Sequence, residues 1–412
     1  MTSRILPMIA AGAIAAVIPV AQASSIEVLH WWTSGGESKA VKLLAEEVTA
    51  KGDKWLDTAI AGGPGQGMQI TMSRMAAGDP PGAVQMPLGM RVKDVAAEKL
   101  LGDISDVSSK GKWADVLPPA VLRSVTFSGK VVAIPVTMHG VNWTWYSRKV
   151  LESAKVAPPK NWDEMMLAAE KIKAAGFIPF AVSSQSWQVA WLYGNILAGV
   201  GGRSAYEQLA AGDTKVFFTS AGQKSFDILA QIRKYADDGQ NNRGWNANAN
   251  LLMADKAAFQ FMGDWAKAEF QAAGKAASSK GPIGCMLTPG TSDFYIMMGD
   301  VFALPAAVKP EVVAAQKRMA EIVMDRDMQI KFAKAKGSLP FRTDVKTDGF
   351  DECAQIAMKV FAKPNGATPS TSMTLRGESS GAYADALAKF WAQPTTAKQG
   401  AESVAAAMRR AQ

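Results

Sequence analysis

The chain has 412 residues, of which 48% are hydrophobic and 20% are charged, with 12 Trp, 2 His and 2 Cys. This composition excludes a disordered, collagen-like or disulfide-dense chain, and at about 100–200 residues per domain the length predicts two or three domains. The formal net charge is +8, but the basic residues are scattered rather than gathered in runs. We therefore expect a solvated mixed surface and no nucleic-acid partner.

Residues 1–23 have the pattern of a secretory signal peptide. Arg4 is the only charge before an apolar stretch over residues 5–20, and Ala21-Gln22-Ala23 forms a small-x-small cleavage site. A membrane anchor is the weaker alternative, because the stretch is shorter than the about 20 apolar residues that span a bilayer. The sequence thus predicts an exported, periplasmic protein with no stable membrane insertion.

Cys285 and Cys353 are the two cysteines of the chain. An oxidising compartment favours one disulfide between them, and two free buried thiols are the alternative.

Strands and helices are expected to alternate from the start of the exported part. Residues 25–32 are rich in strand formers and end at a turn over residues 33–36. A helix should follow and end near Gly52, because four apolar residues share one face: Val41, Leu44, Ala45 and Val48. The Gly- and Pro-rich residues 61–67 predict a loop without the Lys-Ser/Thr of a phosphate loop, and residues 83–86 predict the second strand.

The later elements continue this alternation. Residues 125–127 and 131–134 predict a hairpin around Ser128-Gly129, interrupted at Pro135. Asn161, with Glu164 three residues on, predicts the start of a helix. Further helices are expected to begin at Pro310 and to cover residues 384–391 and 401–408. Together these patterns favour an α/β fold.

Signatures of catalysis are mostly absent from the sequence. There is no Gly-x-Ser-x-Gly, His-Glu-x-x-His or Cys-x-x-Cys, and two histidines and two cysteines cannot build a three-imidazole or four-thiolate zinc site. We expect His30 and His139 to be satisfied polar residues near strand ends rather than bases. The sequence therefore predicts no metal and no cofactor, although a carboxylate pair that hydrolyses glycosides stays open.

Several tryptophans stand beside small polar residues rather than in amphipathic patterns. Trp31-Trp32 ends a strand before a Gly-rich turn and Glu37, so one indole can enter the core while the other faces a cleft. Trp187, Trp245 and Trp265 each neighbour Gly, Asn, Gln or Asp. An indole face packs on the C–H face of a pyranose, and nearby polar groups bind its hydroxyls. Each Trp alone is equally consistent with a core position, but together they favour ligand stacking.

Six segments carry a resemblance to a known family: residues 30–37, 62–67, 134–136 with 139–145, 158–164, 263–267 and 336–342. With these, nearly the whole exported chain resembles the sugar-binding proteins of bacterial ABC transporters. That group includes the maltose-binding proteins, and the likeness is greatest to its periplasmic glucose-binding branch.

The resemblance implies two α/β lobes joined by hinge strands, with a sugar held in the cleft between them. It implies no enzymatic activity, no cofactor, a monomer, and a membrane permease that the closed form contacts, as for other periplasmic binding proteins. The expected first lobe covers residues 24–134 and 288–342. The expected second lobe covers residues 135–287 and 343–412.

The resemblance also implies the ligand-binding residues. In the first lobe these are Trp31, Trp32, Glu37 and Gln66. In the second lobe they are Gln185, Trp187, Trp245, Asp264 and Trp265. Asp300 and Lys336 come from the later crossings between the lobes.

Two departures from the glucose-binding pattern bear on the ligand. Relatives have a Lys in a Gln-Leu-Lys-Gly type segment where this chain has Gln85-Met86-Pro87-Leu88, and residues 369–376 lack the His that relatives carry. Arg376 is a candidate replacement donor, with a plain surface position as the alternative. We predict a protein that binds a monosaccharide or small sugar derivative. A periplasmic carbohydrate-active hydrolase and an adhesin-like module are the alternatives.

Overall fold

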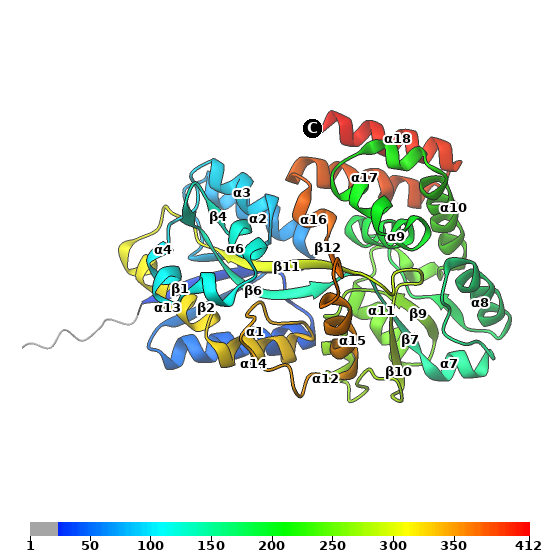
Figure 1. Cartoon of the computed structure of the whole chain (residues 1–412), viewed down its shortest axis with the longest axis horizontal. Helices are drawn as coiled ribbons and strands as arrows, with labels where there is room; N and C mark the ends of the chain where they lie inside the picture. The colour runs from blue at the N-terminus through cyan, green and yellow to red at the C-terminus, as the bar shows by residue number, and fades with distance from the viewer. Residues whose placement is uncertain (1–23) are drawn as a thin grey trace, which may run out of the picture.

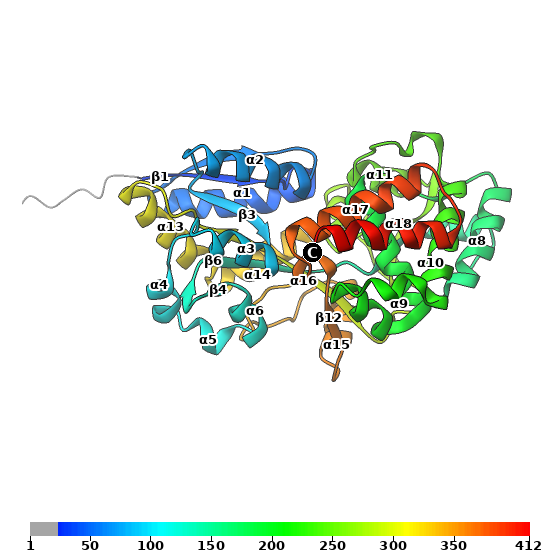
Figure 2. The ribbon, with the colours of Figure 1, turned by 90° about the horizontal axis from the view of Figure 1, so that it is seen from above.

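The computed structural model describes residues 24–412, which form two lobes lying side by side (Figure 1). The expected signal peptide, residues 1–23, lies outside the described residues. Figure 2 shows the same two lobes from above, with the C-terminal helices over the second lobe. No helix within residues 24–412 combines the length and the apolar character needed to cross a membrane.

The first lobe is organised on a six-stranded sheet in the order β12-β11-β3-β1-β2, with β6 paired to β11. β1 is parallel to β2 and β3, whereas β11 is antiparallel to β3 and β6. The strands are β1 (Ser25–His30), β2 (Lys54–Ala59), β3 (Ala83–Pro87), β6 (Ala133–Gly140), β11 (Tyr295–Ala303) and β12 (Ala367–Pro369).

The helix expected after β1 forms, but it begins at Gly35, inside the predicted turn over residues 33–36. Ser34 caps this helix, because its Oγ accepts from the Glu37 N–H and the Glu37 side chain accepts from the Ser34 N–H. Gly52 follows its end with φ +96. The first-lobe helices are α1 (Gly35–Ala50), α2 (Pro64–Ala76), α3 (Met90–Ala97), α4 (Ser105–Lys110), α5 (Trp113–Val116), α6 (Pro119–Ser124), α13 (Pro310–Val323) and α14 (Arg326–Lys336).

The predicted hairpin forms, but the interruption at Pro135 does not. β4 (Thr126–Phe127) pairs with β5 (Lys130–Val131), and Ser128 and Gly129 both have positive φ. Pro135 lies inside β6, where the register against β11 shifts between Asp300 and Val301. A bulge accommodates a proline without ending a strand.

The second lobe is organised on a four-stranded sheet in the order β10-β7-β9-β8. Its strands are β7 (Trp143–Ser147), β8 (Ile178–Phe180), β9 (Ala257–Phe261) and β10 (Ile283–Leu287). The surrounding helices are α7 (Arg148–Ser153), α8 (Trp162–Ala174), α9 (Ser186–Ala210), η1 (Thr214–Phe218), α10 (Ser220–Tyr235), η2 (Asp238–Gln240), α11 (Trp245–Met253), α12 (Ala266–Ala272), α17 (Gly377–Ala392) and α18 (Ala397–Arg410). α8 starts as predicted, because Asn161 Oδ1 accepts from the Glu164 N–H at 2.9 Å.

The chain passes between the sheets at several points. It leaves the first sheet after β6, returns between β10 and β11, and after β12 continues through α16 (Thr371–Thr374) into α17. The expected lobe division assigned residues 135–140 and 367–369 to the second lobe, whereas these residues are β6 and β12 of the first sheet. The rest of that division stays a prediction.

The predicted disulfide is confirmed. Cys285 in β10 is bonded to Cys353 in α15 (Glu352–Phe361), with 6.1 Å between their Cα atoms. The bond joins the second sheet to the helix that precedes β12 of the first sheet. It therefore ties together segments that lead to the two lobes.

Candidate ligand-binding site

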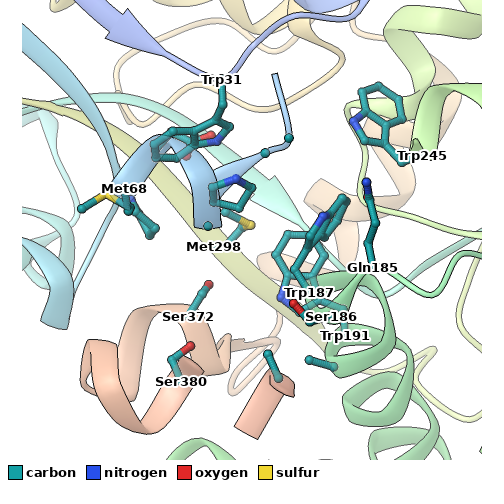
Figure 3. Close-up of a pocket in the computed structure, with 18 of the residues that line it drawn as sticks. Trp31, Met68, Gln185, Ser186, Trp187, Trp191, Trp245, Met298, Ser372 and Ser380 are labelled. Carbon is teal, nitrogen blue, oxygen red and sulfur yellow. The ribbon is translucent and has the colours of Figure 1, made fainter. Parts of the chain in front are cut away.

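A cavity of about 510 Å³ lies between the two lobes (Figure 3). This volume is within the range of roughly 300–1,000 Å³ that small-molecule sites occupy. The first lobe lines it at the carboxyl ends of β1 and β3, where ligands of open α/β sheets bind. The second lobe and the linking helices add the starts of α9 and α11 together with α16 and α17.

Trp31 and Trp32 differ in how far they enter the core. The Trp31 N–H donates to Gln85 Oε1 at 3.0 Å, and its ring lies on α2, where a Cβ on Gly67 would collide with it. Trp32 is 2% exposed and packs against Phe302 and Phe332, with ring centroids 5.6 and 5.5 Å away. Both line the cavity, but Trp32 is mainly a core residue.

A buried ion pair lies beside these indoles. Lys336 Nζ, at the end of α14, donates to Glu37 Oε1 at 2.9 Å. The same ammonium lies 5.8 Å from the ring centroid of Trp32 and 5.6 Å from that of Trp265. Each charge is therefore neutralised by the other, and the two aromatic faces add cation–π contacts to the lysine.

The second lobe contributes a cluster of four tryptophans. The ring centroids of Trp187 and Trp191, both from α9, are 5.0 Å apart, and the rings meet edge to face. The ring centroid of Trp265, just before α12, lies 5.3 Å from that of Trp191. It lies 6.5 Å from the ring centroid of Trp245, at the start of α11. Trp187 and Trp245 are only partly buried, and Figure 3 shows both beside Gln185. This wall offers flat apolar surfaces with an amide next to them.

His139, at the end of β6, lies between two carboxylates. Its Nδ1 is 2.5 Å from Asp264 Oδ1, and its Nε2 is 3.4 Å from Asp300 Oδ2 without hydrogen-bond geometry. Burial alone would lower the pKa of His139. The Asp264 and Asp300 carboxylates outweigh burial and raise that pKa above its ordinary value, while Lys336 opposes them.

Most of the residues expected to bind ligand do line the cavity. They are Trp31, Trp32, Glu37, Gln185, Trp187, Trp245, Trp265, Asp300 and Lys336. Their contact with a ligand stays a prediction. Gln66, Asp264 and Arg376 do not line it.

Gln66 is displaced because the Gly-rich segment is not a loop throughout. Gly62 and Gly63 make a turn with positive φ, and α2 begins at Pro64. Gln66 is therefore helical and exposed, and it folds back over Gly62, where a Cβ would collide with its Oε1. Gln69, one turn later on α2, lines the cavity instead.

Asp264 and Arg376 are each occupied elsewhere. Asp264 is 2% exposed, and besides His139 it accepts from the Gly140 N–H at 2.9 Å and the Tyr295 hydroxyl at 3.1 Å. Asp264 therefore fixes His139 at the end of β6 and Tyr295 at the start of β11. The Arg376 side chain is 70% exposed and lies 3.7 Å from Asp94. It matches the surface alternative.

Several lining residues were not singled out from the sequence. Trp191 follows Trp187 by four positions, so the spacing of one helix face would have identified it. Arg91 on α3 and Asp385 on α17 carry charge into the cavity, but no local pattern marks them. Their places depend on how the lobes meet.

Comparison with known proteins agrees with this arrangement. Residues 58–316 match the family model described as bacterial extracellular solute-binding protein. The chain is 35% identical over 379 residues to a "Probable sugar-binding periplasmic protein" of Brucella suis, which covers 91% of this chain and 88% of that protein. This chain belongs to the bacterial extracellular solute-binding protein family.

Solved structures extend the comparison to the fold. A chitin oligosaccharide binding protein superposes with a TM-score of 0.79 at 17% identity, over 94% of this chain and 98% of its own. The solute receptor AcbH superposes with a TM-score of 0.76 at 18% identity, over 94% and 97%. The predicted two-lobed solute-binding fold is confirmed. Because the family consists of binding proteins rather than enzymes, the hydrolase alternative is not supported.

Proposed function

We propose that this protein is a periplasmic sugar-binding protein of an ABC importer, which captures a monosaccharide or small sugar derivative in the cleft. The observation that carries the proposal is that tryptophans from the two lobes face each other across one cavity. Trp31 on one lobe and Trp187 and Trp245 on the other offer ring-stacking faces (Figure 3). Glu37 and Asp300 line the same cavity. Stacking surfaces with a few fixed polar groups suit a pyranose.

The relatives support a sugar rather than another solute. The Brucella suis protein is named as sugar-binding and periplasmic at 35% identity over nearly the whole chain. Among the structural neighbours, AcbH is described as preferring b-D-galactopyranose, and another neighbour binds chitin oligosaccharides. The neighbours thus include both a monosaccharide and an oligosaccharide receptor, and the polar groups enclosed by indoles favour the smaller ligand here.

The proposed cycle uses the two lobes and the strands between them. Ligand contacts from both lobes stabilise a closed arrangement over an open one, because only the closed form makes both sets of contacts. We propose that a monomer in this closed form docks on a membrane permease and releases the sugar there. The expected signal peptide and the names of the relatives support a periplasmic location.

A thermal-shift screen tests the proposal. The purified protein is melted with free sugars, sugar acids, amino sugars and polyols, with amino acids as a non-sugar control set. A ligand at about 100 times its dissociation constant adds about 2.7 kcal/mol to the free energy of unfolding. The double variant Trp187→Ala/Trp245→Ala should lose the shift. A screen in which no sugar raises the melting temperature contradicts the proposal.

A further inference from the structure

The cavity has two chemically different ends. One end holds the tryptophans and the Glu37–Lys336 ion pair. The other end is formed by α3, α16 and α17 and presents Arg91, Ser372 and Ser380. Figure 3 shows Ser372 and Ser380 on the helices opposite Trp31, with their hydroxyls directed toward the cavity. This second end therefore presents a guanidinium and two hydroxyls to the cavity.

Arg91 brings a positive charge that has no counterion in the described part of the chain. Of the cationic Lys and Arg side chains that line the cavity, Lys336 is paired with Glu37. Within residues 24–412, no carboxylate lies at ion-pair distance from the Arg91 guanidinium. The adjacent Asp94 instead accepts from the Gly377 N–H at 3.2 Å and faces Arg376.

The position of Arg91 is defined by a glycine. A Cβ on Gly377 would collide with Nη1 of Arg91, so the guanidinium rests directly on the backbone at the start of α17. Arg91 itself is only partly exposed. A guanidinium does not lose its proton in proteins, so a partly buried one in a closing cleft favours a bound anion.

We infer that the ligand is an acidic sugar, whose ring stacks on the tryptophans and whose carboxylate binds Arg91. This inference rests on the proposed sugar-binding function. The planar fork of an arginine matches the two oxygens of a carboxylate, and the Ser372 and Ser380 hydroxyls lie at the same end as further donors. Arg91 thereby supplies the charged donor that the sequence suggested for Arg376.

Asp385 limits how much negative charge the ligand can carry at this end of the cavity. It lies on α17 at the same end of the cavity, and its side chain is exposed. A second negative charge on the ligand would be repelled by this carboxylate, with partial screening by solvent. The site therefore selects a singly charged carboxylate over a phosphate ester.

Matched ligand pairs test the inference by calorimetry. Glucose is compared with glucuronic acid and galactose with galacturonic acid, because each pair differs only in the oxidation of one carbon. Wild-type protein should bind the acid of one pair roughly tenfold to a hundredfold tighter than its neutral partner. Arg91→Gln should reduce that ratio to near one, and added salt should weaken the acid more than the neutral sugar.

Two variants serve as controls, and the outcomes separate the two proposals. Arg376→Gln, outside the cavity, should leave the ratio unchanged, and Asp385→Asn should increase it. Equal or tighter binding of the neutral sugars overturns the acidic-sugar inference and leaves the sugar-binding proposal standing. An unchanged ratio in a folded Arg91→Gln variant also overturns it. If no member of the wider sugar panel binds, the proposed function fails and this inference fails with it.

Discussion

The first-lobe wall of the cleft holds its groups inside the protein, whereas the second-lobe wall presents its groups at the starts of helices. Trp32 is 2% exposed and Lys336 is 1% exposed, and both contact core or ion-pair partners. Trp187 and Trp245 are partly exposed at the first turns of α9 and α11. The two walls line one cavity but differ in what supports them.

The two walls therefore differ in what their residues contribute to stability and to ligand binding. A buried polar group must have a partner, so Glu37 and Lys336 stabilise the first lobe whether or not a ligand is present. A partly exposed indole loses its remaining exposure to water only when a ligand covers it. We therefore expect changes to the buried Trp32 and Lys336 to reduce stability. Changes to the partly exposed Trp187 and Trp245 should reduce affinity.

The largest expected effect comes from breaking the buried ion pair. Lys336→Met leaves the Glu37 carboxylate buried without its partner, which should lower the free energy of unfolding by about 3–5 kcal/mol. Urea unfolding measures the loss. Lys42→Met is the matched control, because the Lys42–Glu46 pair is exposed and should contribute under about 1 kcal/mol. Equal losses in the two variants would contradict the contrast between buried and exposed charge.

A pair of tryptophan variants compares the walls directly. Trp32→Ala removes an indole packed on Phe302 and Phe332 and should cost about 3–5 kcal/mol of stability. Trp245→Ala should weaken sugar binding by a few-fold to tenfold, through about 0.5–1.5 kcal/mol of lost stacking, with a small change in stability. Unfolding and calorimetry on both variants give the comparison. A Trp245→Ala protein that is as destabilised as Trp32→Ala would show that the walls do not differ.

The disulfide supports the junction between the walls. Reduction breaks the bond, and the double variant Cys285→Ser/Cys353→Ser removes it; the bond joins residues 68 positions apart in sequence. The unfolded chain then regains loop entropy, and stability should fall by about 2–4 kcal/mol. Melting with and without reductant measures the difference. The double variant should be insensitive to reductant, and a reductant effect in it would assign the change to another cause.

Much of the fold follows from local patterns in the sequence. The N-cap at Asn161 and the hairpin at Ser128-Gly129 form where expected, because capping and turn chemistry depend on a few adjacent residues. Pro135 shows the limit of such reasoning. Whether a proline ends a strand depends on the register of its partner strand, which lies far away in sequence.

The site was predictable where a side chain is fixed by its own element. Trp31 and Trp187 line the cavity because a strand end and a helix start direct them there. Asp264 was misplaced because the partners that bind it, His139 and Tyr295, come from other elements. Arg91 was not predicted for the same reason, because only the packing of α3 against Gly377 brings it to the cavity.

The smallest expected effect is the pH dependence of stability that arises from His139, at the end of β6. Its pKa is raised by Asp264 and Asp300 against burial and Lys336, so the folded state binds the proton more tightly than the unfolded state, whose pKa is about 6.5. The stabilisation is therefore complete below about pH 6.5 and is lost as pH rises through the higher folded pKa. The stability difference between wild type and His139→Gln should shrink with rising pH when both are unfolded in urea. A difference that grows toward alkaline pH would contradict a protonated His139 between the two carboxylates.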